Sequence, residues 1–305
     1  MNLERRPLGK TGLQVSVLGL GGSEVGYQDV PQKTVDAIIG RALDLGVNLI
    51  DTAECYADSE RLIGRALGKR RKDVVLMTKC GHATFASATD HTGRFASSEW
   101  SPAMLARSID RSLQRLGTDC VDVLQFHSPP SEVLNDDGAI RVLQQARESG
   151  KALFIGCSTD SDDAVRAVEL GVFDTLQISV SIADQEAIDR VLPKALERGI
   201  GVIAKRPIAN AAWLGKSVDG YSQPYRDRLN KLGYDFLKRA DSAATALRFT
   251  LAVAGVSCAI VGTTKPARYE ENARAVASGP LPPAEYDAIR DRWRKIAAPD
   301  WTGQR

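Results

Sequence analysis

The chain has 305 residues, enough to bury the core of one large α/β domain or of two average domains. Forty basic residues against 38 acidic ones leave a net charge of +2, so the charge balance gives no indication of a nucleic-acid or membrane partner. The five cysteines lack the spacing of a disulfide framework or a zinc ribbon, and no apolar run is long enough to span a bilayer. The sequence therefore predicts a cytoplasmic protein with no metal site, either a monomer or a weak homo-oligomer.

Apolar runs typical of β-strands alternate with helical patterns along the chain. The first segment, from Arg6 to Ser16, has the pattern of a hairpin with a Gly9–Gly12 turn. The predicted strands after it are Leu18–Leu20, Asn48–Asp51, Val74–Thr78, Val121–Phe126, Ala152–Gly156, Thr175–Ile178, Val202–Ala204 and Cys258–Val261. The predicted helices that follow them in turn are Gln32–Leu45, one from Ser59, Ser101–Leu116, Ala139–Ser149, Asp160–Leu170, Asp184–Arg198, Ser242–Ala254 and Lys265–Ser278.

Eight strand-then-helix units joined by right-handed crossovers predict a (β/α)₈ TIM barrel, an α/β fold. The hairpin is expected to plug the barrel bottom, and a final amphipathic helix, Pro283–Ile296, is expected to pack outside it. Since no linker interrupts the alternation, we expect residues 1–305 to form a single domain. A doubly wound open sheet has the same alternation and is the alternative.

Three local features refine this prediction. Ser59 and Ser101 are expected to be helix N-caps, and Pro102 suits the first helical turn after Ser101. The insertion Pro207–Ala240 is predicted to be a functional loop because it is long and rich in aromatic residues.

Four polar residues lie at, or just after, the carboxyl ends of predicted strands. Asp51 ends one strand and Tyr56 follows in the next loop, while Lys79 and His127 end two further strands. Each taken alone has an ordinary structural explanation, such as a helix cap or a solvated side chain. Together they predict a site at the carboxyl end of the barrel, where barrel enzymes place their catalytic groups.

These side chains suit the protonation of a carbonyl oxygen. A tyrosine has an ordinary pKa of about 10, and a neighbouring lysine ammonium is expected to lower the pKa of Tyr56. Asp51 would keep Lys79 charged, and His127 would hold the carbonyl oxygen or relay its proton. No side chain delivers hydride, so this chemistry requires a redox cofactor.

The segment from Ile260 to Asn272 is a candidate cofactor site. A predicted strand ends at Gly262, Thr263 and Thr264 follow, and a helix begins whose N-terminal N–H groups suit a phosphate. Arg268 could pair with a 2′-phosphate, which favours NADP(H), with NAD(H) as the alternative. An ordinary capped helix with a surface arginine is the simpler interpretation of this segment taken alone.

These motifs resemble those of the aldo-keto reductases from about Arg6 to Asn272. The similarity is most specific over Asp51–Glu60, Thr78–Lys79 and Leu124–His127. It implies a (β/α)₈ barrel, a nicotinamide cofactor (usually NADPH) and a catalytic tetrad of Asp51, Tyr56, Lys79 and His127. It also implies cofactor contacts at Gly21, Ser158, Gln177, Lys205, Arg206, Gly262, Thr263, Thr264, Arg268, Glu271 and Asn272.

The chain departs from the family pattern at three places. The segment Ile178–Ser181 after Gln177 lacks the glutamate and tyrosine often found there. Thr159 stands where the family usually has an asparagine after Ser158, and Lys205–Arg206 replaces the aromatic residue that commonly stacks on the nicotinamide. Two other functions remain open: a regulatory barrel that binds NADPH with little turnover, and a Schiff-base lyase that uses Lys79.

The substrate is expected to contact the loops 81–100, 128–137 and 207–240. Their aromatic residues and one in the C-terminal tail predict an apolar pocket: Phe85, Phe95, Trp100, Trp213 and Trp301. His82 and His91 of the first loop are expected at the surface, with contact to the substrate as the alternative.

Overall fold

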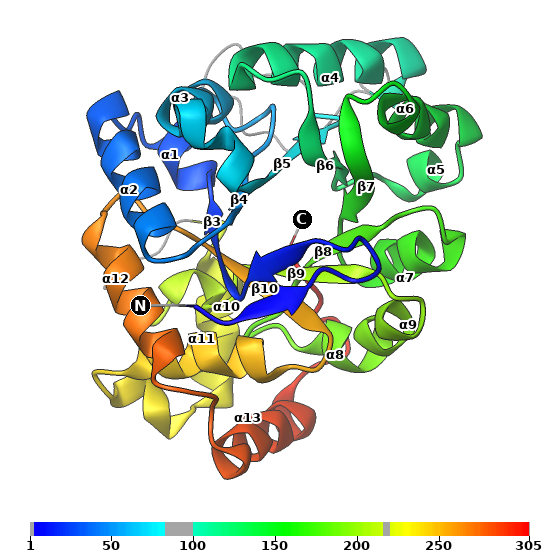
Figure 1. Ribbon diagram of the computed structural model, residues 1–305. Coiled ribbons are helices and arrows are strands. Elements are labelled where there is room, and N and C mark those ends of the chain that lie inside the picture. Colours follow the sequence, from blue (N-terminus) through cyan, green and yellow to red (C-terminus); the bar gives the residue numbers. More distant parts are fainter. Residues whose placement is uncertain (1–2, 83–99, 216–219, 305) are drawn as a thin grey trace.

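The computed structural model describes residues 3–82, 100–215 and 220–304. Within this part of the chain, eight parallel strands close into a barrel in the order β10-β3-β4-β5-β6-β7-β8-β9 (Figure 1). The strands are β3 (Leu18–Gly21), β4 (Leu49–Asp51), β5 (Val75–Cys80), β6 (Val121–His127), β7 (Ala152–Ser158), β8 (Thr175–Ser179), β9 (Gly201–Lys205) and β10 (Val256–Gly262). Because β10 pairs with both β3 and β9, the barrel prediction is confirmed and the open sheet is wrong.

Helices surround the barrel (Figure 1). They are α1 (Ser23–Tyr27), α2 (Gln32–Asp44), α3 (Ser59–Leu67), α4 (Pro102–Leu116), α5 (Ser131–Leu134), α6 (Asp137–Glu148), α7 (Ser161–Leu170), α8 (Glu186–Arg190), α9 (Leu192–Glu197), α10 (Gln223–Leu232), α11 (Ser242–Ala252), α12 (Ala267–Ala277) and α13 (Pro283–Ile296). Helix α4 illustrates why they pack there: Leu105, Ile109 and Leu116 recur at helical spacing and are buried. As predicted, Ser101 caps α4, since its side chain accepts a hydrogen bond from the Met104 N–H.

The N-terminal hairpin closes the barrel end from which the strands start. Strand β1 (Arg5–Pro7) pairs antiparallel with β2 (Gln14–Ser16), and both lie across the barrel in Figure 1. Leu8 and Val15 are fully buried and join an interior cluster with Leu49, Met77 and other strand residues. The hairpin therefore supplies part of the barrel core, as the sequence predicts.

Two predicted elements differ from the observed ones. The predicted helix Asp184–Arg198 is divided into α8 and α9, because Pro193 lacks the N–H that would continue the hydrogen-bond ladder. Helix α3 has Asp58, not Ser59, at its N-cap, and the Ser59 hydroxyl instead donates to the Gly22 carbonyl at 2.7 Å. The first difference is a local effect of proline, and the second reflects a tertiary contact of the Ser59 hydroxyl.

The insertion 207–240 is not a simple loop. It contains α10, and its aromatic residues Tyr225, Tyr234 and Phe236 are buried in the hydrophobic core. Trp100 and Trp301 belong to the same core, and the Trp100 ring meets the His82 ring edge to face at 6.1 Å. Phe85, Phe95 and His91 lie outside the described residues.

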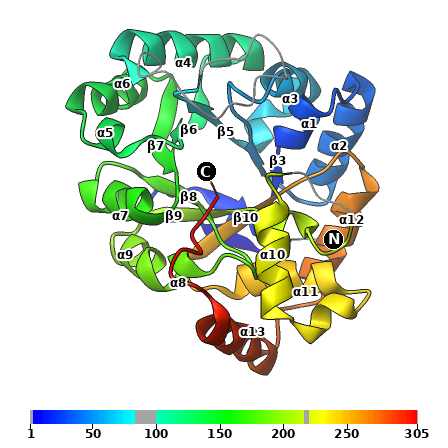
Figure 2. The same ribbon diagram turned by 180° about the vertical axis from the view of Figure 1, so that it is seen from behind.

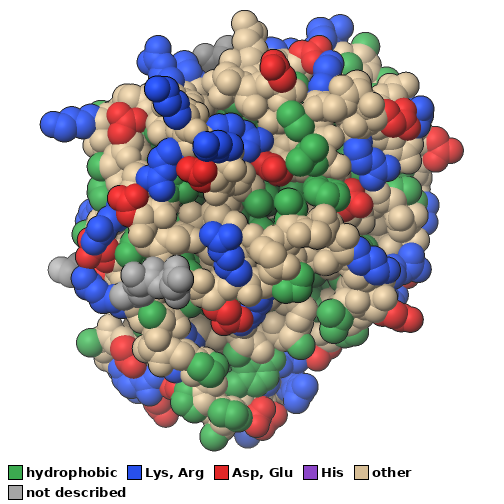
Figure 3. Space-filling view, viewed as in Figure 1, with side chains coloured by type: hydrophobic (Ala, Val, Ile, Leu, Met, Phe, Trp, Pro, Cys, Tyr) green, Lys and Arg blue, Asp and Glu red, His purple; other side chains and the backbone are tan. Residues whose placement is uncertain are grey.

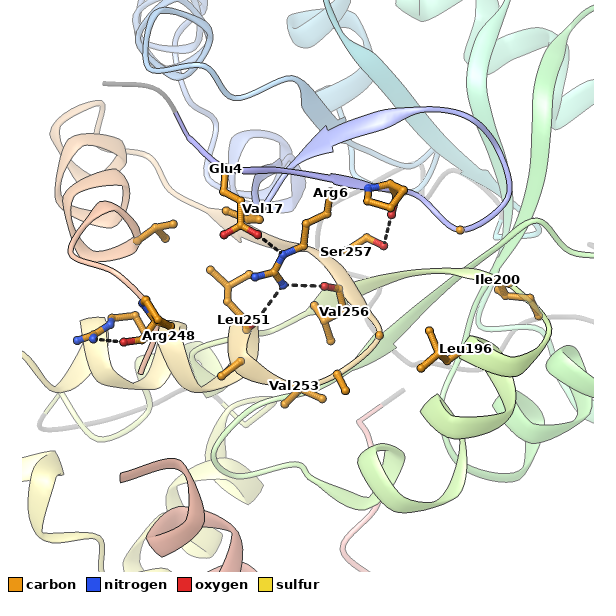
Figure 4. A pocket seen from close by; sticks show the side chains of 18 of the residues that line it. Glu4, Arg6, Val17, Leu196, Ile200, Arg248, Leu251, Val253, Val256 and Ser257 are labelled. Atoms are coloured by element: carbon orange, nitrogen blue, oxygen red, sulfur yellow. Dashed lines mark hydrogen bonds and ion pairs between the residues drawn. The ribbon is translucent and has the colours of Figure 1, made fainter. Parts of the chain in front are cut away.

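The hairpin end of the barrel carries a cavity of about 740 Å³, lined among others by Arg6, Leu196 and Leu251 (Figure 4). The Arg6 guanidinium donates to the Leu251 and Val256 carbonyls there, so its charge is used to join the hairpin to the barrel wall. On the same face, basic and acidic side chains are interspersed (Figure 3). Among the described residues, no helix is both long and apolar enough to cross a membrane.

Candidate functional site

The strand register brings the predicted site residues to one end of the barrel, the end seen in Figure 2. The paired positions that join neighbouring strands there are Gly262 with Gly21, Gly21 with Asp51, Lys79 with Gln125, His127 with Ser158, Ser158 with Gln177, and Ser179 with Lys205. Parallel strands share one carboxyl end, so side chains distant in the sequence become neighbours on this rim.

A buried ion pair forms the floor of the site. The Lys79 ammonium donates to the Asp51 carboxylate at 2.6 Å and to the Thr52 carbonyl at 2.8 Å. Lys79 is 1% exposed and Asp51 2% exposed, so neither charge is hydrated. Gln125 adds an amide donor at 3.4 Å from the other Asp51 oxygen. A charge pair this deep persists because each partner neutralises the other.

Tyr56 reaches the same site from the loop after β4. The backbone N–H groups of Thr52 and Glu54 donate to β5 carbonyls, which ties the loop to the strand carrying Lys79. The Lys79 ammonium lies 4.9 Å from the centre of the Tyr56 ring. The Tyr56 and His127 rings meet edge to face at 5.4 Å. The four predicted catalytic residues therefore converge.

The Tyr56 loop also depends on a close backbone approach by helix α1. A Cβ atom added at Gly26 would lie 1.9 Å from the Tyr56 carbonyl oxygen. Glycine is consequently needed at position 26 for steric reasons. Farther along the loop, the buried Glu54 carboxylate accepts a hydrogen bond from Arg111 at 2.7 Å, which anchors the loop to α4.

The predicted lowering of the Tyr56 pKa is wrong for this arrangement. Burial raises the pKa of Tyr56 well above 10, and the Asp51 carboxylate raises it further. The Lys79 ammonium, already paired with Asp51, faces the ring of Tyr56. The phenol therefore stays protonated at neutral pH, as a proton donor must.

His127 is held by two neighbours that the sequence analysis did not assign to the site. The Cys55 thiol lies 3.2 Å from His127 Nδ1, and the His82 ring stacks on the His127 ring at 4.3 Å. His82 is buried, so its predicted surface position is wrong. Burial, followed by the charge of Lys79, lowers the pKa of His82 to about 3. Burial and then His82 lower the pKa of His127, so both imidazoles are neutral at pH 7.

Ser158 and Gln177 offer a place for a carboxamide. The Ser158 hydroxyl donates to Gln177 Oε1 at 2.9 Å. Among the described residues, Gln177 Nε2 and Thr159 Oγ1 are buried and lack a hydrogen-bond partner. A buried donor without a partner is costly, and a nicotinamide carboxamide presents the complementary oxygen and amide. These residues fit the cofactor that the family resemblance implies.

The predicted phosphate-binding segment after β10 is partly exposed, and some of its polar groups already have hydrogen-bond partners within the protein. Gly262 ends β10, Thr263 and Thr264 follow it, and all three are partly exposed, as is Asn272 on α12. The Thr263 hydroxyl accepts a hydrogen bond from the Lys265 N–H at 3.0 Å.

Two carboxylates lie in or next to this segment. Arg268 pairs with Glu271 at 2.8 Å on the surface of α12. The Glu24 carboxylate packs closely against Gly262. A Cβ atom added at Gly262 would lie 1.7 Å from Glu24 Oε2, so this contact requires glycine. No sequence pattern predicted a role for Glu24. Helix α1, which carries Glu24, lies next to β10 because β10 pairs with β3 to close the barrel.

The side chains of Lys205 and Arg206 form ion pairs and hydrogen bonds with other residues of the protein. Lys205 pairs with Asp160 at 2.9 Å, and Arg206 donates to Ser179 and to the Gln304 carbonyl, each at 2.6 Å. Burial opposes ionisation of Asp160, but the charges of Lys205 and Arg206 lower its pKa. The C-terminal segment thus crosses the barrel mouth onto this buried network (Figure 2).

Comparison with known proteins agrees with this geometry. The model of the aldo/keto reductase family matches residues 17–294. L-galactose dehydrogenase of Arabidopsis thaliana is 30% identical over 293 residues, which cover 90% of this chain and 88% of that protein. The NADH-specific methylglyoxal reductase of Escherichia coli is 30% identical over 249 residues, or 76% of this chain and 75% of that protein.

The fold is shared with a solved structure as well. An aldo-keto reductase from Bacillus halodurans, in its holo form, superimposes with a TM-score of 0.82 at 24% identity and covers 98% of this chain and 99% of that one. At this identity the superposition shows the barrel architecture alone. The family model, which spans most of the chain, shows more: the protein is an oxidoreductase that belongs to the aldo/keto reductase family, whose members use nicotinamide cofactors.

Proposed function

We propose that this protein reduces aldehyde or ketone carbonyls to alcohols, reversibly, with NADPH as the hydride source and Tyr56 as the proton donor. The observation that carries the proposal is the placement of a buried Lys79–Asp51 pair beside the Tyr56 phenol and the His127 imidazole. We further propose that residues 1–305 act as one cytoplasmic domain of the alcohol dehydrogenase or carbonyl reductase type.

The proposed roles follow from the chemistry of each group. As hydride adds to the carbonyl carbon, the π electrons of the C=O bond move onto oxygen, and this oxygen takes the proton of the Tyr56 hydroxyl. The resulting phenolate lies beside the Lys79–Asp51 pair and regains its proton from water. His127, neutral at pH 7, donates a hydrogen bond to the carbonyl oxygen and orients it. A bound nicotinamide supplies the hydride, which no side chain provides.

Ser158 and Gln177 would hold the carboxamide of the nicotinamide, which matches the unpartnered Gln177 amide nitrogen among the described residues. The adenosine end would lie along Gly262, Thr263, Thr264 and α12. The preference for NADP(H) rests on Arg268, which would exchange its surface pair with Glu271 for a 2′-phosphate.

The decisive test is a turnover panel. Aldehydes, ketones and sugars are assayed by the loss of NADPH absorbance, with NADH in parallel. Saturable oxidation of NADPH that depends on a carbonyl substrate supports the proposal. Tight cofactor binding without turnover on any carbonyl would contradict it.

That contrary result would favour a regulatory NADPH-binding barrel. A putative voltage-gated potassium channel subunit beta of Schizosaccharomyces pombe is 27% identical over 314 residues, which makes this the second candidate function. The Schiff-base alternative is disfavoured, because Lys79 Nζ is buried and charged against Asp51, whereas imine formation needs a neutral amine open to substrate.

Glu24 is expected to weaken NADPH binding. Its carboxylate lies at Gly262, beside the proposed phosphate segment, and repels an anionic ligand. Glu24→Gln should lower the Kd for NADPH by about threefold to tenfold at low salt, with a smaller gain at high salt. Fluorescence titration measures this, with Glu148→Gln on α6 as a matched control. An equal affinity in Glu24→Gln would show that the carboxylate does not repel the cofactor, and a weaker affinity would show that it helps to bind it.

Gly26→Ala is expected to disturb the Tyr56 loop. The added methyl group overlaps the Tyr56 carbonyl, so the loop must shift by about an ångström and kcat should fall by about 100-fold. Gly40→Ala on α2 is the matched control, because a Cβ there meets nothing within 4 Å. That control should gain about 0.5–1 kcal/mol of stability. Wild-type kcat in Gly26→Ala would mean that the Tyr56 loop tolerates the shift.

A further inference from the structure

Cys55 contacts the proposed catalytic histidine directly. Its thiol lies 3.2 Å from His127 Nδ1, although the two residues are 72 positions apart in the sequence. Cys55 is 5% exposed, and its carbonyl accepts a hydrogen bond from the Tyr27 hydroxyl at 3.1 Å. The thiol is therefore fixed on the imidazole edge that carries Nδ1.

The direction of this hydrogen bond follows from the chemistry of the two groups. Burial raises the pKa of Cys55 to about 12, so the thiol keeps its proton. An imidazole nitrogen is a good acceptor, whereas thiol sulfur is a weak one. The S–H group consequently donates to Nδ1. A neutral imidazole that accepts at Nδ1 carries its own proton on Nε2.

His82 completes the arrangement by fixing the ring plane. Its imidazole stacks on that of His127 with an interplanar angle of 21°. The stack restrains the face of the His127 ring, while Cys55 restrains one edge. With Nδ1 occupied by the thiol, Nε2 is the ring nitrogen left to donate to a substrate oxygen.

We propose that Cys55 is a positioning residue that selects the Nε2–H tautomer of His127, so that His127 donates a hydrogen bond to the substrate carbonyl. The tautomer assignment stands on the Cys55–His127 geometry, and its effect on turnover rests on the proposed carbonyl reduction. His82 supports the same function by holding the ring plane.

Nitrogen NMR of the full-length protein tests the tautomer without any assay of turnover. The chain has three histidines, so a ¹⁵N-histidine-labelled sample gives three ring systems, and His127→Gln identifies the signals of interest. We expect a protonated Nε2 and an unprotonated Nδ1 on His127 at pH 7. Cys55→Val, which keeps the size and removes the donor, should give a mixture of tautomers. Cys55→Ser should restore the wild-type pattern, and Cys120→Val controls for loss of a distant thiol.

Kinetics of the same variants give the second readout. Loss of one neutral hydrogen bond should lower kcat of Cys55→Val by about fivefold with little change in KM, and Cys55→Ser should recover most of it. A protonated Nδ1 in the wild type, or an unchanged tautomer in Cys55→Val, would overturn the inference. If the expected tautomers are found but the wild type turns over no carbonyl, the proposed function fails and the role of Cys55 in selecting the tautomer stands.

Discussion

Tyr56→Phe is expected to lower kcat for carbonyl reduction by about 10²–10⁴-fold, because it removes the proton donor and leaves the ring in place. The Kd for NADPH should stay within about twofold of wild type, since the phenol contributes little to cofactor binding under the proposed mechanism. Stopped-flow single turnovers measure the chemical step, and fluorescence titration measures the affinity.

A phenol outside the barrel provides the control for this substitution. Tyr286→Phe on α13 should retain wild-type kcat, because Tyr286 stacks on Phe249 away from the site. Turnover of Tyr56→Phe close to wild type would remove Tyr56 from the mechanism. A parallel loss of cofactor affinity would instead indicate that the substitution had damaged the site as a whole.

Breaking the Lys79–Asp51 pair is expected to produce the largest stability loss in the barrel. Both side chains are almost fully buried, and Asp51→Asn or Lys79→Met leaves one charge without its partner. An uncompensated buried charge costs about 3–5 kcal/mol. Chemical denaturation of each variant should show this loss, together with a strong decrease in turnover.

The double variant separates charge from packing. Asp51→Asn combined with Lys79→Met leaves no isolated charge and should be more stable than either single variant. Lys238→Met, which breaks the exposed pair with Asp235, should leave stability nearly unchanged. Single variants as stable as the wild type would show that water or a rearranged partner neutralises the remaining charge.

Local sequence patterns predicted the elements that depend on local physics. The Val121–Phe126 and Thr175–Ile178 runs became β6 and β8 because their mostly apolar residues suit parallel strands covered on both faces. Ser101 and Pro102 started α4 as expected, since a capping hydroxyl and a first-turn proline act within one turn of the helix. The positions of the four proposed catalytic residues followed from the same strand ends.

Features that depend on distant neighbours were not predictable in this way. The pKa of Tyr56 is raised because the barrel buries the phenol beside Asp51, while Lys79 is already paired. His82 was expected at the surface, yet its ring stacks on His127 across the barrel rim. The Glu24 carboxylate meets Gly262 only because β10 closes onto β3.

The sequence by itself therefore determined the eight strand-then-helix units, the hairpin plug and the candidate residues at the strand ends. Hydrophobic periodicity and helix capping act over a few residues and can be recognised in a linear chain. Tertiary structure alone decided the charge states and contacts inside the site. Desolvation and electrostatic coupling depend on which groups become neighbours. The barrel brings together Cys55 and His82, which follow β4 and β5, and His127, which ends β6.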